Sequence, residues 1–149
     1  LPPPAQQGHT RAAEFTGSIY FWGQGAAIDY PRAMAAYKVG AEGGNAVSQY
    51  LVGFMYFMGQ GVAVDYKLAR PWLQKAAAQV DPHAVINLGT MYGLGQGVTP
   101  SWRRARELYE RAIELGNSVA VQNMQTLTMN IQKVSYTSRL FHHLPYHEP

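Results

Sequence analysis

An internal repeat of 36 residues constrains the fold of this chain more than any other feature. The triplet Gly-Gln-Gly occurs at positions 23–25, 59–61 and 95–97, which are separated by that step. Single residues recur at the same step: glycine at 17, 53 and 89, tyrosine at 20, 56 and 92, and alanine at 33, 69 and 105. A fixed period of this length is typical of stacked supersecondary units, each of which buries its apolar face against its neighbours.

The stretch MYFMGQGVAVDY, residues 55–66, has the outline of a phosphate-binding loop, because an apolar run leads into a Gly-x-Gly turn. Its repetition argues against that function, since a phosphate loop forms a single site. The dinucleotide-binding version also requires a third glycine, and Ile28, Val64 and Pro100 occupy that position in the three copies. The Gly-Lys-Ser/Thr run of the Walker version is absent. We therefore interpret each copy as a turn between two helices.

Each unit is predicted to form a helix, a turn and a second helix. In the second unit these helices are expected over residues 46–58 and 66–79. Asn45 and Asp65 precede them as N-caps, because their side chains can accept a hydrogen bond from an otherwise unpaired backbone N–H. Gly59 is expected to end the first helix in the left-handed conformation.

The predicted fold class is all-α: an α-solenoid of three antiparallel helix pairs, followed by a C-terminal capping helix, without a β-sheet. The solenoid domain is expected over residues 9–133, and the capping helix occupies about 118–133. Residues 1–8 are predicted to be an N-terminal extension, in which the prolines at 2–4 block a full helix. Residues 134–149 show no clear period and are predicted to form a tail.

The composition is that of a folded domain. With 149 residues, 47% apolar and 14% charged, the chain can bury the core of one domain. No apolar run reaches the roughly 18 residues of a membrane span. There is no cysteine, which excludes disulfides and thiol chemistry, and the net charge of +3 is too mild to indicate nucleic acid. Because the chain begins with Leu1, we expect a fragment or a processed soluble protein, such as one delivered to an organelle or exported; no compartment follows from the sequence.

The segment NLGTMYGLGQGVTPSWRRARELYERAIELGN, residues 87–117, resembles a Sel-one-like repeat (SLR), a relative of the tetratricopeptide repeat. Three such units cover about residues 9–117, and a partial fourth helix extends the match to about 131. The resemblance implies an α-solenoid whose first helices line a concave face. It also implies a non-catalytic scaffold or adaptor that binds other proteins.

Particular residues of the repeat carry local expectations. Gly53 and Ala69 are small, so they should let the two helices of the second unit approach closely. Val80 stands where the family normally has a glycine that ends the second helix, which makes the turn there a departure from the pattern. Pro71 lies inside the second helix and removes a backbone bond, so a local kink is expected.

A second apolar stripe on the first helices is the candidate partner-binding site. The stripe comprises Val47, Leu51, Phe54 and Met58 in the second unit, Phe15 and Trp22 in the first, and His83 and Leu94 in the third. The family pattern already buries another face of these helices, so the stripe should face the concave side. Either a partner covers it, or it is ordinary core covered by the N-terminal segment or the tail, because large exposed apolar patches are uncommon on monomers.

The segment WRRARELYER, residues 102–111, is a basic cluster on the last repeat. Three pairs with a spacing of four are expected to match most of its charge: Arg103 with Glu107, Arg106 with Glu110, and Glu107 with Arg111. Only Arg104 is left over. A nucleic-acid surface requires several unpaired cations with interleaved aromatic residues, so nucleic acid is not an expected partner.

The tail contains the candidate metal ligands His142, His143 and His147 beside Glu148. Pro145 interrupts the i, i+4 pair that a helix-borne site would need, so we predict no metal. The aspartates at 29, 65 and 81 are explained as helix caps.

The leading functional prediction is a protein–protein interaction module, including the case of an accessory subunit in a larger assembly. No cofactor, catalytic residue or small-molecule substrate is expected. The alternative is a hydrolase acting on a cell-wall or peptide-like substrate. A carboxylate or histidine lining the groove would favour that alternative, and His83 is the one such residue on the stripe.

Overall fold

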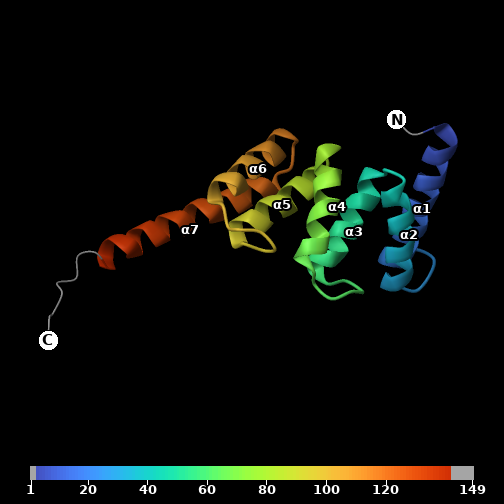
Figure 1. The fold of residues 1–149 in the computed structure, drawn as a ribbon, viewed down its shortest axis with the longest axis horizontal. Helices are drawn as coiled ribbons and strands as arrows, with labels where there is room; N and C mark the ends of the chain where they lie inside the picture. The colour runs from blue at the N-terminus through green and yellow to red at the C-terminus, as the bar shows by residue number, and fades with distance from the viewer. Residues whose placement is uncertain (1–2, 142–149) are drawn as a thin grey trace.

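The computed structural model describes residues 3–141, which form seven α-helices and no β-strand within that range (Figure 1). The helices are α1 (Pro4–Trp22), α2 (Tyr30–Glu42), α3 (Ala46–Met58), α4 (Tyr66–Ala78), α5 (Pro82–Leu94), α6 (Trp102–Glu114) and α7 (Val119–Phe141). Helix α1 packs against α2, α3 against α4 and α5 against α6, and each pair packs on the next along the chain. The predicted solenoid of three helix pairs and a C-terminal helix is therefore confirmed.

The predicted caps set the helix boundaries. The side chains of Asn45, Asp65 and Asp81 each accept a hydrogen bond from the backbone N–H three residues later, at 2.8–2.9 Å. Gly59 follows the last residue of α3 with a φ of 72°, and its N–H donates to the Met55 carbonyl. These bonds pair backbone groups that a helix end would otherwise leave open.

The repeated glycine at the centre of each first helix allows close packing. A Cβ atom added to Gly53 would lie 2.8 Å from the Leu73 Cγ, and one added to Gly89 would lie 2.7 Å from the Tyr109 Cε1. Real Cβ atoms do not approach other atoms so closely. The predicted close approach is confirmed, with Leu73, one turn beyond the fully buried Ala69, as the nearest neighbour of Gly53.

Val80 takes the backbone conformation of the glycines that it replaces. Its φ is 68°, and the equivalent residues Gly44 and Gly116 have φ values of 92° and 84°. The turn is therefore preserved, although the left-handed conformation costs an L-residue about 1–2 kcal/mol. Helix α4 runs through Pro71, and the local kink there remains a prediction.

The two ends of the chain differ from the sequence-based expectation. Helix α1 begins at Pro4, so the expectation that residues 4–8 are not helical is wrong; proline is tolerated in the first turn, where its missing N–H has no partner to lose. Helix α7 continues to Phe141, so residues 134–141 of the predicted tail are helical. No glycine or proline interrupts residues 119–141, which explains the longer helix. Figure 1 shows α7 projecting beyond α5 and α6.

Candidate interaction groove

Most of the predicted stripe is exposed. Trp22, Met58 and Leu94 are the last residues of α1, α3 and α5, and their exposed fractions are 61%, 52% and 65%. They occupy the same position in the three repeats. We call these three residues the exposed row. Phe15 and Val47 are also exposed, at 67% and 42%.

The middle of the stripe is part of the core. Leu51 is 8% exposed and belongs to the buried cluster that contains Phe21, so the expectation that it is accessible in the groove is wrong. The reason is its place in the stack: Leu51 lies on α3, which has the first repeat before it, whereas the equivalent Phe15 lies on the first helix. Phe54 is half-buried against the same cluster, with its ring 5.6 Å from that of Tyr50.

His83 is an exposed residue with local partners. Its ring lies 5.6 Å from the Tyr50 ring, and its Nδ1 is 3.5 Å from the side-chain nitrogen of Asn117. The ring therefore lies on the surface, within hydrogen-bonding distance of Asn117. Burial and, to a smaller extent, the negative charge of Asp81 raise the pKa of Tyr50 to about 12, and the side chain of Asn87 offsets only a small part of that rise.

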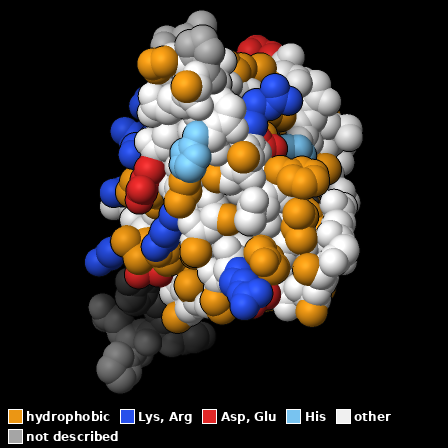
Figure 2. Space-filling model, turned by 90° about the vertical axis from the view of Figure 1, so that its right-hand side faces the viewer, with side chains coloured by type: hydrophobic (Ala, Val, Ile, Leu, Met, Phe, Trp, Pro, Cys, Tyr) orange, Lys and Arg blue, Asp and Glu red, His pale blue; other side chains and the backbone are white. Residues whose placement is uncertain are grey.

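The described ends of the chain do not cover the exposed row. Helix α1 is itself the first layer of the stack, and α7 packs mainly against α6 before it leaves the solenoid (Figure 1). Figure 2 looks onto the N-terminal end of the molecule, where hydrophobic side chains lie among charged ones at the surface. Within the described residues, neither α1 nor α7 therefore buries Trp22, Met58 and Leu94, which remain exposed; residues 142–149 of the predicted tail lie outside the described range.

A groove of about 290 Å³ adjoins the last member of the exposed row. Helix α5 lines it with Thr90, Gly93 and Leu94, α6 with Trp102 and Tyr109, and α7 with Asn123, Thr126, Leu127 and Asn130. None of these residues is charged. The sequence interpretation missed this groove, although one signal was available: Gly93 stands where the first two repeats have Phe21 and Phe57.

The floor of the groove has satisfied hydrogen bonds. The hydroxyls of Thr90 and Tyr109 lie 3.1 Å apart, and Thr90 also donates to the Ile86 carbonyl at 3.2 Å. Burial raises the pKa of Tyr109, so its hydroxyl stays neutral well into the alkaline range. The floor therefore offers neither a charge nor an activated nucleophile to a bound molecule.

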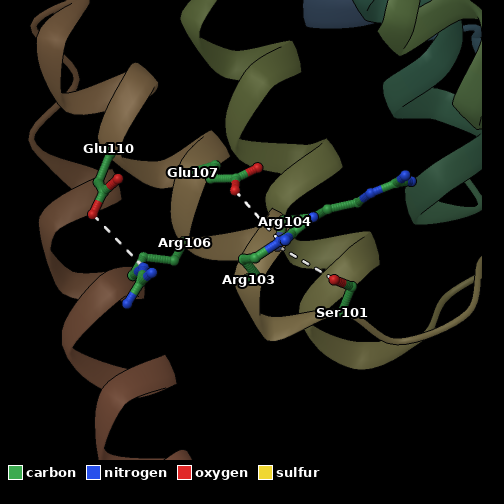
Figure 3. Close-up of polar contacts among 6 residues, drawn as sticks. All are labelled: Ser101, Arg103, Arg104, Arg106, Glu107 and Glu110. Carbon is green, nitrogen blue, oxygen red and sulfur yellow. Dashed lines mark hydrogen bonds and ion pairs between the residues drawn. The ribbon is translucent and has the colours of Figure 1, made fainter.

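The basic cluster on α6 is largely paired, as expected. Arg103 lies 3.6 Å from Glu107, and Arg106 lies 3.9 Å from Glu110, both on an exposed face (Figure 3). The third expected pair, between Glu107 and Arg111, is not among the ion pairs that the structure describes. Arg104, expected to be left over, donates to the Tyr92 hydroxyl at 3.2 Å and covers the Tyr92 ring. A free cationic surface is therefore not assembled here.

The candidate metal ligands His142, His143, His147 and Glu148 lie outside the described residues. Within residues 3–141 no group of three His, Cys, Asp or Glu side chains is placed to hold a metal ion. Among the helices described, none has both the length and the apolar character that crossing a membrane requires.

Comparison with solved structures identifies similar helical proteins. A Sel1 repeat protein from Oxalobacter formigenes is 29% identical with a TM-score of 0.73, over 83% of this chain and 50% of that one. The protective antigen c5321 of uropathogenic Escherichia coli, which displays an SLR fold, is 37% identical with a TM-score of 0.73, over 78% and 25%. Cysteine rich protein B of Helicobacter pylori shares the fold alone, at 22% identity and a TM-score of 0.63, over 79% and 90%. This chain thus spans half or less of the length of the first two.

The family comparison agrees with the internal repeat. No curated protein matches the chain. The model of the Sel1 repeat matches three consecutive segments, at residues 10–45, 46–81 and 82–117. Solenoids of this kind are generally interaction modules, because stacked repeats form an extended concave surface. Since these matches cover most of its length and agree with the observed helix pairs, the chain belongs to the Sel1 repeat family.

Proposed function

We propose that this chain is a non-catalytic adaptor that binds a protein partner along the exposed row of Trp22, Met58 and Leu94. The single observation that carries the proposal is that each first helix of the three repeats ends in a large, exposed apolar side chain. One such residue would be ordinary, since scattered apolar side chains are common on protein surfaces. Three exposed apolar residues at the same repeat position, one on each first helix, recur with the period of the solenoid.

The chemistry of the row favours a protein partner. Tryptophan, methionine and leucine offer apolar contact area, and aromatic residues and methionine are enriched in the cores of protein interfaces. The row leads to the groove between α5 and α7, which is lined by apolar, amide and hydroxyl side chains. A partner segment lying there would bury apolar side chains and meet neutral hydrogen-bonding groups. An accessory subunit held within a larger assembly would use the same contacts.

The competing functions lack a supporting observation. Nucleic acid would need unpaired cations, whereas Arg103 and Arg106 form ion pairs and Arg104 covers Tyr92. A hydrolase would be favoured by a carboxylate or histidine on the stripe, where His83 is the one such residue; its ring lies against Tyr50 and its Nδ1 is 3.5 Å from the side-chain nitrogen of Asn117. The groove between α5 and α7 is lined by neither residue type.

Site-specific photo-crosslinking tests the proposal. A photoreactive phenylalanine analogue replaces Met58 or Leu94 in the row, and Val39 or Ile113 serves as the control, because these apolar side chains are exposed on the second helices α2 and α6. The labelled chain is then irradiated in native extract. We expect one common protein to crosslink from both row positions and from neither control. Equal crosslinking from row and control positions would refute a site on this face.

A further inference from the structure

The third repeat lacks an aromatic side chain that the first two repeats contain. Phe21 packs against Tyr30 with ring centroids 5.4 Å apart, and Phe57 packs against Tyr66 with centroids 5.6 Å apart; in both pairs the rings meet edge to face at 64°. The equivalent residues of the third repeat are Gly93 and Trp102. The second ring of the pair is present, but the first is missing.

No packing requirement explains the glycine at position 93. A Cβ atom added there would meet the Ala105 Cβ and the Leu127 Cδ1 at 3.7 Å, which is ordinary van der Waals contact. Gly93 is also not among the described glycines with a positive φ, so its backbone does not require glycine. Gly89, one turn earlier, is different, because its added Cβ would lie 2.7 Å from the Tyr109 ring. Gly93 therefore leaves space open, whereas Gly89 admits a neighbour.

The open space has the size and surroundings for one aromatic ring. The groove volume of about 290 Å³ exceeds the roughly 150 Å³ of an engineered cavity that binds benzene. Trp102 lines it and is 36% exposed, so its ring is available for the edge-to-face contact that Tyr30 and Tyr66 make elsewhere. Aromatic pairs favour that geometry.

The lining of the groove favours an aromatic residue within a peptide. Asn123 and Asn130 on α7 line the groove, and their amide groups can both donate and accept hydrogen bonds. The backbone of an extended peptide presents the matching N–H and C=O groups. No charged side chain lines the groove, so a charged ligand would find no ion-pair partner among its walls.

We propose that this groove binds a phenylalanine or tyrosine side chain from an uncharged segment of a partner protein, and that the ring takes the place occupied by Phe21 and Phe57 in the other repeats. This inference rests on the proposed adaptor function and names the chemistry of its partner. We infer a peptide rather than a free aromatic molecule, because the same groove offers apolar side chains for the ring and the amide groups of Asn123 and Asn130 for the peptide backbone.

Peptide titration followed by NMR tests the proposal. The probe is the acetylated and amidated peptide Gly-Ser-Phe-Ser-Gly, and the control probe has alanine in place of phenylalanine. We expect the phenylalanine peptide to shift the Trp102 indole and Gly93 amide signals saturably, and to bind about tenfold or more tightly than the alanine peptide. Equal binding of the two peptides, or binding without shifts at Gly93 and Trp102, would overturn the proposal.

Two variants assign the binding to the open space. Gly93→Phe fills the groove with its own ring and should weaken binding of the phenylalanine peptide by about tenfold or more. Gly93→Ala adds only a methyl group and should retain binding. Trp102→Ala removes the second ring of the pair and should also weaken binding, which keeps the test valid if Gly93→Phe does not fold. Wild-type affinity in folded Gly93→Phe, or in Trp102→Ala, would overturn the proposal.

The result is separable from that of the adaptor test. If the row positions still crosslink a common protein while the phenylalanine peptide fails to bind, only the inference about the groove is wrong. If neither the row nor the groove binds, the adaptor function is wrong as well.

Discussion

The second and third repeats share a scaffold and differ in the surface that they present. Gly53 and Gly89 both sit against a large side chain of the following helix, and Met55 and Met91 are both fully buried. On the groove side, the second repeat has a phenylalanine at 57, whereas the third has Gly93 and an open groove.

Some differences between the repeats keep the helices packed together, whereas the glycine at position 93 leaves a space unfilled. The first and third repeats join their helices with a hydroxyl pair, Ser18 with Tyr37 and Thr90 with Tyr109. The second repeat has Phe54 and Leu73 at these positions, so both residues are apolar there. Both partners have changed together there. At position 93 no other described side chain fills the space, which is why we assign this change to binding.

The largest expected effect concerns the shared scaffold. Gly53→Leu and Gly89→Leu should each destabilise the fold by several kcal/mol, because added bulk in a tight core typically costs about 1–3 kcal/mol and sometimes more. Thermal or denaturant unfolding measures the loss. Melting of both variants near the wild-type temperature would show that these glycines are not in close contact.

The exposed row should affect binding rather than folding. Trp22→Ala should weaken partner binding by about 1–4 kcal/mol with little change in melting temperature, because large apolar anchors dominate binding energy. The sequence led us to expect the same of Phe54→Ala, but Phe54 is half-buried against the core, so that variant should also lower the melting temperature. Calorimetric titration and thermal unfolding of the two variants distinguish these roles. Unfolding of Trp22→Ala would place Trp22 in the scaffold.

The second and third repeats also differ at position 50, where the third repeat has Ile86 in place of Tyr50. The stability of the fold at alkaline pH should depend on this tyrosine. The folded-state pKa of Tyr50 is raised from 10.0 to about 12, mainly by burial. The unfolded chain therefore loses this proton first, so the stabilising contribution of Tyr50 is complete below pH 10 and is lost as the pH rises toward 12. The free energy of unfolding should fall across this window, and less steeply in Tyr50→Phe. Identical slopes would contradict the assignment.

The smallest expected effect concerns the turn between the second and third repeats. Val80→Gly should stabilise the fold by about 0.5–1 kcal/mol, because relief of the left-handed strain exceeds the entropic cost of a more flexible unfolded chain. Val80 is half exposed, so little packing is lost. Gly116→Val, the reverse change one repeat later, should destabilise. A loss of stability in Val80→Gly, measured by denaturant unfolding, would show that the valine side chain has a packing role.

The scaffold was predictable from the sequence because its rules are local and repeated. The caps Asn45 and Asp65 and the turn residue Gly59 need only their own neighbours, and the 36-residue step marks them three times. The exposure of Leu51 was mispredicted, because its burial depends on which helix precedes it in the stack. Local reasoning also placed the start of α1 too late, after the prolines, and the end of α7 too early, where the period ends.

The groove itself was not predicted, although its cause is visible in the sequence. Gly93 breaks a repeated position, but a glycine in a helix can mark either a close contact or an empty space. Only the neighbours decide between them: the Tyr109 ring is 2.7 Å from an added Cβ at Gly89, whereas nothing lies nearer than 3.7 Å at Gly93. These distances depend on the packing of α6 and α7, which the pattern of a single helix does not contain.

Thermal unfolding of Gly93→Phe beside Gly89→Phe shows whether the space at Gly93 is open, because the two glycines lie one turn apart on α5 and face different neighbours. Gly93→Phe should melt at or above the wild-type temperature, since the ring enters open space beside Trp102. Gly89→Phe should melt far below it, since the ring would collide with Tyr109. A fall of more than about 4 °C in Gly93→Phe, which corresponds to roughly 1 kcal/mol in a domain of this size, would contradict the claim that the third repeat holds an open site for an aromatic side chain.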